Sequence, residues 1–204
     1  ERLPSVTNII SMTKKTEEKE ALEKWKRENK DSEIILKESS NRGTLMHGYL
    51  SEMLMGKMNG ELIEEVNLPK KMAETIISHG LNDYVKEVYA SEECVYSLKY
   101  KYAGTMDALI CTQDNKLQIC DFKQKNSPAR REYSSISNYF TQCILYAIAH
   151  NEIYGTNIQS CIILMCTPNL IFQKFEIEGQ EFMDLQKEAL ERVEHYHQLI
   201  SKSI

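Results

Sequence analysis

The spacing of hydrophobic and polar residues predicts helices in the first part of the chain. An extended lead-in over residues 3–10 ends in a short helix, and residues 17–29, rich in Glu, Lys, Ala and Leu, favour a charged surface helix. Ser39 or Ser40 is a candidate cap for a further helix that ends near Gly56. Leu68-Pro69 opens another, with the proline in the first turn, which we expect to extend to about residue 89.

The pattern changes near residue 94, where β-branched and aromatic residues and alternating polarity predict strands. Three of these, over 94–98, 100–111 and 116–123, form a meander. A helix over 131–150, strands over 160–166 and 170–177, and an amphipathic helix over 181–200 follow. This order predicts an α/β fold in which helices flank a mixed central sheet. We expect one domain over residues 1–204, with residues 1–90 mostly helical and residues 91–204 forming an αβ core.

Composition narrows the class of protein. The chain is 42% hydrophobic and 27% charged, as in ordinary globular proteins, and it lacks the run of about 18 apolar residues that a membrane span requires. Its net charge of −5 argues against a protein that coats DNA non-specifically, but carboxylates of a metal site would add negative charge. Its six cysteines include no C-x-x-C pair, so reduced thiols in an intracellular protein are expected.

Two strand carboxylates and a lysine are the main candidates for chemistry. Gly104-Thr105-Met106-Asp107 is followed, after thirteen residues, by Asp121-Phe122-Lys123. Asp121 and Lys123 lie two apart on a predicted strand and so point to one face, and the preceding strand can bring Asp107 beside Asp121. Close carboxylates suit Mg²⁺ or Mn²⁺, and a lysine beside them can orient water and neutralise charge on a phosphate. Phosphodiester hydrolysis requires these parts.

The acid-x-Lys pattern alone is weak. It also occurs at three other places, which are Glu17/Lys19, Glu28/Lys30 and Asp114/Lys116. Those lie on the charged helix or in a turn, where solvated charges are expected, whereas Asp121 ends an apolar strand. From the pattern alone, an ordinary pair of surface charges stays open as the alternative.

Several segments, in order along the chain, resemble the PD-(D/E)xK nuclease superfamily, in particular its RecB-type exonuclease branch. They are most similar to the mitochondrial genome maintenance exonuclease group and its phage relatives. The segments are Leu3 to Thr7, Arg42 to His47, Tyr102 to Asp107, Ile119 to Lys123, and the Q-x-x-x-Y pattern from Gln142 to Tyr146. Met106 stands where the superfamily's name has proline, a position that varies in this branch.

The resemblance implies a restriction-endonuclease-like core and a role for each motif residue. The implied metal ligands are His47, Asp107, Asp121 and the carbonyl of Phe122, and Lys123 would position or activate water. Gln142 and Tyr146, four apart on one helix face, would reach the site. Glu92 or Glu93 is a further candidate carboxylate. No iron–sulfur cluster is expected, because the cysteine set for one is missing. Without the resemblance, a structural histidine and a partly buried helix face would be the alternatives.

Basic and aromatic residues follow the catalytic strand and predict contacts to DNA. The candidates are Lys125, Arg130, Arg131 and Tyr133, and Arg42, near His47, is a second candidate for contact with phosphate. Cations interspersed with aromatic rings suit single-stranded DNA, although a solvated basic loop is the alternative. The expected protein is a monomeric, Mg²⁺- or Mn²⁺-dependent exonuclease that trims single-stranded DNA from an end in repair, recombination or replication. A flap endonuclease and a non-catalytic nucleic-acid-binding protein stay open, as does a mitochondrial location if a transit peptide has been trimmed.

Overall fold

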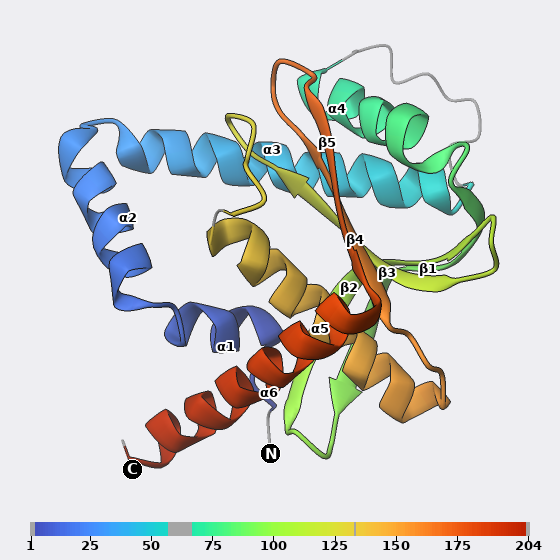
Figure 1. The fold of residues 1–204 in the computed structure, drawn as a ribbon. Coiled ribbons are helices and arrows are strands. Elements are labelled where there is room, and N and C mark those ends of the chain that lie inside the picture. Colours follow the sequence, from blue (N-terminus) through green and yellow to red (C-terminus); the bar gives the residue numbers. More distant parts are fainter. Residues whose placement is uncertain (1–2, 57–66, 133, 203–204) are drawn as a thin grey trace.

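A computed structural model describes residues 3–56, 67–132 and 134–202 (Figure 1). Its centre is a five-stranded sheet in the order β1 (Val85–Ser97), β2 (Tyr102–Thr112), β3 (Leu117–Gln124), β4 (Ser160–Cys166) and β5 (Phe172–Glu178). Neighbouring strands are antiparallel except β3 and β4, which are parallel and joined through helix α5 (Ser134–Tyr154). The predicted α/β fold with a mixed central sheet is confirmed.

Helices cover both faces of the sheet. α1 (Val6–Met12), α5 and α6 (Gly179–Ser201) pack on one face, and α3 (Ser32–Leu54) and α4 (Leu68–Ile76) pack on the other. Strand β3 serves both layers because its side chains alternate: Ile119 belongs to the α5 side, and Cys120 and Phe122 belong to the α3 side. Strand β4, which is buried along its whole length, therefore reads as a nearly continuous apolar run.

The N-terminal segment belongs to the core, whereas the next helix does not. Val6, Ile9 and Ile10 of α1 are buried with the α5 residues, and the backbone N–H of Ala103 donates to the carbonyl of Pro4 at 3.0 Å. By contrast, α2 (Thr16–Glu28) has no buried residue. Figure 1 shows α2 standing at the edge of the molecule between α1 and α3.

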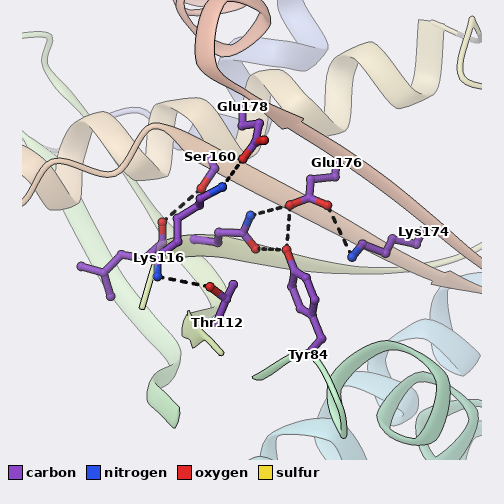
Figure 2. A network of polar contacts seen from close by, with 9 residues as sticks. Tyr84, Thr112, Lys116, Ser160, Lys174, Glu176 and Glu178 are labelled. Atoms are coloured by element: carbon purple, nitrogen blue, oxygen red, sulfur yellow. Dashed lines mark hydrogen bonds and ion pairs between the residues drawn. The ribbon is translucent and has the colours of Figure 1, made fainter. Parts of the chain in front are cut away.

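A polar network ties the first half of β3 to β5 (Figure 2). The hydroxyl of Tyr84 lies 2.7 Å from both Gln118 Oε1 and Glu176 Oε1, and Gln118 Nε2 donates to the same Glu176 oxygen at 2.7 Å. Lys174 lies 3.6 Å above the Tyr84 ring. Gln118 is fully buried, so these bonds satisfy an amide that would otherwise cost stability.

Two helix boundaries differ from the predicted ones. The helix from Leu68 continues as a single π-helical stretch, Ile77–Leu81, and then stops, because residues from Val85 onward pair with β2. The expected end near residue 89 and the division at residue 90 therefore fall inside a strand. Helix α3 also begins at Ser32, earlier than predicted, so Ser39 lies inside the helix and its hydroxyl donates to Gln124 at 3.1 Å.

Two further expectations concern the environment of the chain. None of the helices in the described ranges is long and apolar enough to cross a membrane. All six cysteines are free thiols; five are buried and Cys94 is exposed.

Candidate active site

The two predicted carboxylates lie where β2 and β3 separate. The last paired residues of this ladder are Ala108 and Cys120, so Asp107 and Asp121 are the next residues along each strand. The backbone N–H of Phe122 donates to Asp107 Oδ2 at 2.7 Å, in place of a ladder bond. Both aspartates are buried, with 8% and 1% of their surfaces exposed. The turn between the strands thus brings together two acidic groups that lie fourteen positions apart.

Asp121 forms a close ion pair with Lys123 and has spare coordination capacity. Lys123 Nζ lies 2.6 Å from Asp121 Oδ2, and its ammonium also lies 5.1 Å from the ring centre of Tyr139 on α5. Apart from this ion pair, neither carboxylate oxygen of Asp121 has a hydrogen-bond donor in the described part of the chain. Buried oxygens without such a donor are costly unless a cation binds them.

His47 and Glu92 complete the acidic cluster from outside these strands. His47 Nδ1, on α3, lies 3.5 Å from Asp107 Oδ1 and 3.7 Å from Glu92 Oε1. One ligand atom from each of the three residues lies within 4.8 Å of the others. Glu92 has a φ of +53° and drops out of the β1–β2 pairing, a strained conformation typical of functional positions. Glu93 instead pairs with Met106, so Glu92 is the carboxylate that the structure places here.

The pKa shifts within the cluster show that its buried carboxylates are stabilised by neighbouring positive charges. Burial raises the pKa of Asp121 to about 7. Burial acts in the same direction on Asp107, yet Lys123 and His47 outweigh it and lower the pKa of Asp107. Burial opposes the charge on His47, but Asp107 and Glu92 raise its pKa to about 10. Burial also opposes the charge on Lys123, and the two aspartates again raise its pKa.

These residues fit a bound divalent cation. Two carboxylates and an imidazole converge at His47, Glu92 and Asp107, and the nearby Asp121 oxygens lack hydrogen-bond donors within the described ranges. Asp107 and Glu92 favour a proton on His47. A bound metal ion would replace that proton and offset the same negative charge, because a ligand nitrogen binds a metal only when it is deprotonated.

The predicted α5 residues support the site from the face of the sheet opposite to α3 and His47. Gln142 Nε2 donates to the Tyr146 hydroxyl at 2.9 Å. The Tyr146 ring packs on Gly104, where an added Cβ would lie 2.6 Å from Tyr146 Cε1. The glycine of the Gly104–Asp107 segment is therefore required by the aromatic ring above it. Tyr139 was not predicted to contact Lys123, although it lies on the same face of the helix, three positions before Gln142.

Replacing Gly104 with alanine is expected to destabilise the fold by about 1–3 kcal/mol, because the buried Tyr146 ring must move. Gly43→Ala in α3 is the matched control: its Cβ would meet nothing within 4 Å, so helix propensity should stabilise it by up to about 1 kcal/mol. Denaturant unfolding of both variants measures the difference. Equal stability of Gly104→Ala and the unmodified chain would contradict the packing described.

The predicted DNA-contact residues have different surroundings. Arg42 donates to Gln124 at 3.2 Å and to Asn126, both neutral amides. Lys125 donates to the Ser135 hydroxyl at 2.9 Å, and Arg130 is exposed. Arg131 instead pairs with Glu181 of α6 at 2.6 Å and donates to the carbonyl of Glu176. Tyr133 lies outside the described residues.

The chain resembles known proteins in its fold and not in its sequence. No protein-family model and no curated protein matches the sequence. Among solved structures, a protein from Eubacterium rectale described as a "putative exonuclease" aligns with a TM-score of 0.52 and 18% identity, over 79% of this chain and 66% of that protein. At this identity the alignment shows that the two chains share a fold.

Two other similar structures are named as exonucleases but align less closely. The phage-related exonuclease from Haemophilus somnus 129PT has a TM-score of 0.40 and 16% identity, over 78% of this chain and 83% of that protein. The alkaline exonuclease from Laribacter hongkongensis has a TM-score of 0.32 and 15% identity, over 76% and 84%. At such low identities the similarity shows a shared fold only. Of these three structures, the Eubacterium rectale protein alone has a TM-score above 0.5.

One hollow borders the acidic cluster, and a second lies beside Tyr139, which contacts Lys123. One, of about 710 Å³, is lined by Gly43, Thr44, Ser51 and the metal-ligand candidates His47 and Glu92. The other, of about 360 Å³, lies between α1, α2 and α5 and includes Tyr139 and Gln142. The acidic cluster can therefore be approached from the α3 side, through His47 and Glu92.

Proposed function

We propose that this chain is a metal-dependent exonuclease that hydrolyses phosphodiester bonds of single-stranded DNA from a free end, in repair, recombination or replication. One observation carries the proposal: two buried carboxylates lie at neighbouring strand positions, with a lysine ammonium 2.6 Å from one of them. The fold that the chain shares with the Eubacterium rectale protein, which is described as a "putative exonuclease", supports the proposal.

The proposed cation is Mg²⁺ or Mn²⁺, because the donor set is mainly oxygen with one imidazole. His47, Glu92 and Asp107 would hold it, with Asp121 and the carbonyl of Phe122 as the remaining candidates. Such a cation, when bound, polarises the scissile phosphate and lowers the pKa of an attacking water.

Lys123 would act through its charge. Asp121 and Asp107 hold the proton on Lys123 Nζ, so the ammonium can donate a hydrogen bond to a phosphate oxygen and offset the charge that develops there. In this state it orients water or phosphate and does not act as a base. The face of Tyr139 keeps the ammonium in place.

Arg42 and Lys125 are the proposed phosphate contacts. Both lie beside the end of β3, and the hydrogen-bond partners of Arg42 are neutral amides, so no carboxylate within the described residues offsets its charge. Arg130, which is exposed, extends the proposed DNA path, and Tyr133 remains a candidate outside the described residues. The ion pair of Arg131 with Glu181 makes it the weaker candidate.

Linear and circular single-stranded DNA of one sequence separate the alternatives. We expect the linear substrate to be degraded in Mg²⁺ or Mn²⁺, the circle to stay closed, and a chelator to stop the reaction. End-labelled products on a denaturing gel report the result. Cleavage of the circle would make the protein an endonuclease, and no degradation of any nucleic acid in Mn²⁺ would leave only binding.

A further inference from the structure

The hollow between α1, α2 and α5 carries a further inference. It encloses about 360 Å³, near the lower end of the roughly 300–1,000 Å³ range of small-ligand pockets. Its lining includes a cation, hydroxyls, an amide, an aliphatic side chain and an aromatic ring, which are Lys14, Ser11, Ser135, Gln142, Leu22 and Tyr139.

This pocket is connected to the proposed reacting groups through Tyr139 and Gln142. Tyr139, which lines it, holds the Lys123 ammonium at 5.1 Å from its ring centre. Gln142, also in the lining, is oriented by the bond from its Nε2 to the Tyr146 hydroxyl, and its Oε1 has no partner within the described ranges. Ser135 receives the hydrogen bond of Lys125. A ligand in the pocket would therefore contact Tyr139, which itself contacts Lys123.

The pocket wall on α2 is fixed by a polar relay. α2 buries no residue of its own, yet Glu18 accepts a hydrogen bond from Asn138 of α5 at 2.8 Å. Asn138 in turn accepts one from Arg192 of α6 at 2.6 Å, and Arg192 also donates to Thr13 and to the carbonyl of Ile10. Three helices and the end of α1 are thus cross-linked around the cavity, so its shape is preorganised.

We propose that this pocket takes the base of one unpaired nucleotide of the DNA strand, adjacent to the bond that is cut. The proposal rests on the nuclease function above. Tyr139 and Leu22 offer apolar surface to the faces of a base, and Gln142 Oε1, Ser11 and Ser135 can bond its polar edge. Lys14, which forms no ion pair within the described residues, can attract the adjoining phosphate. A paired base cannot present its edge here, which favours single-stranded substrates.

An abasic scan tests this proposal. Short single-stranded DNAs of one sequence carry a single abasic site that moves one position at a time. Binding is measured by fluorescence anisotropy with chelator, and cleavage is measured with Mn²⁺. In the unmodified chain, one position should weaken binding at least about fivefold, as loss of one stacked base does.

Leu22→Trp provides the second arm. Leu22 is 41% exposed on a helix without buried residues, so tryptophan can fill the pocket and leave the core intact. In this variant, intact and abasic DNA should bind equally, at the weakened level. Leu98→Trp, an exposed leucine outside the pocket, is the control and should keep the abasic effect.

Three outcomes overturn the pocket: no position matters in the unmodified chain, Leu22→Trp keeps the full abasic effect, or the Leu98→Trp control loses it. Absence of cleavage with the binding pattern intact would instead remove the nuclease function and leave the pocket as a site for an unpaired base.

Discussion

Lys123→Met is expected to lower the rate of DNA cleavage about 100- to 1000-fold while leaving DNA affinity nearly unchanged. Methionine keeps most of the length and apolar contact of lysine, so it should still pack against Tyr139. What is lost is the ammonium 2.6 Å from Asp121, and with it the charge available to a phosphate in the transition state. Because Asp121 already has a pKa raised to about 7, it can take up a proton when its partner is removed, and the fold should persist.

Lys125→Met is the matched control for this loss. Lys125 lies two positions further along and donates to Ser135 outside the acidic cluster. We expect it to weaken DNA binding, with a higher KM and a largely preserved kcat, and to reduce the salt dependence of binding. Single-turnover cleavage and anisotropy titrations of both variants separate the two effects. Comparable cleavage by Lys123→Met and the unmodified chain would remove Lys123 from the mechanism.

The centre of the site could be predicted because its parts are local in sequence. Asp107 and Asp121 lie on strands joined by a short turn, so a hairpin brings them together once both strands are recognised. The side-chain alternation of a strand does the same for Asp121 and Lys123. Hairpin pairing also explains why the order of the sheet from β1 to β3 follows from the sequence.

The approach of His47 and Glu92 depends on tertiary packing. His47 lies on α3, which is placed by the packing of Met46 and Leu50 under the sheet, far from Asp107 in sequence. Glu92 turns toward it only because its backbone takes φ +53° at an irregular point of β1. Glu92 and Glu93 look alike in the sequence, and neither propensity nor alternation marks which one leaves the ladder.

The prediction that the helix from Leu68 extends to about residue 89 is wrong for a similar reason. Residues 77–89 contain helix-compatible side chains, but pairing with β2 along residues from Val85 outweighs that weak preference. Gly80 also packs against Leu164, where a Cβ would lie 2.9 Å from its Cδ1, so this end of the helix is set by contacts with β4. The pocket between α1, α2 and α5 could not be predicted from the sequence either, because its wall depends on the Glu18–Asn138–Arg192 relay between distant segments.

Asp107→Asn is expected to abolish cleavage and the stabilisation of the fold by divalent cations together. In the unmodified chain, Mn²⁺ at about 100 times its Kd should contribute about 2.7 kcal/mol, which raises Tm by roughly 5–10 °C for a domain of this size. Asparagine keeps an oxygen that can accept the 2.7 Å bond from the Phe122 N–H, so the strand ends should stay in place. It removes the negative charge that faces His47 and Lys123, and the cation should no longer bind tightly.

Thermal unfolding with Mn²⁺, Mg²⁺ or chelator measures the shift without reference to activity. Asp83→Asn, which removes an exposed carboxylate outside the cluster, should retain both the metal-dependent shift and cleavage. If Mn²⁺ raised the Tm of Asp107→Asn as much as that of the unmodified chain, the stabilising cation would lie elsewhere on the surface. A ligand that binds only the folded state must lose its effect when its site is removed. Loss of cleavage with that shift intact would assign Asp107 a role in the reaction separate from holding the cation.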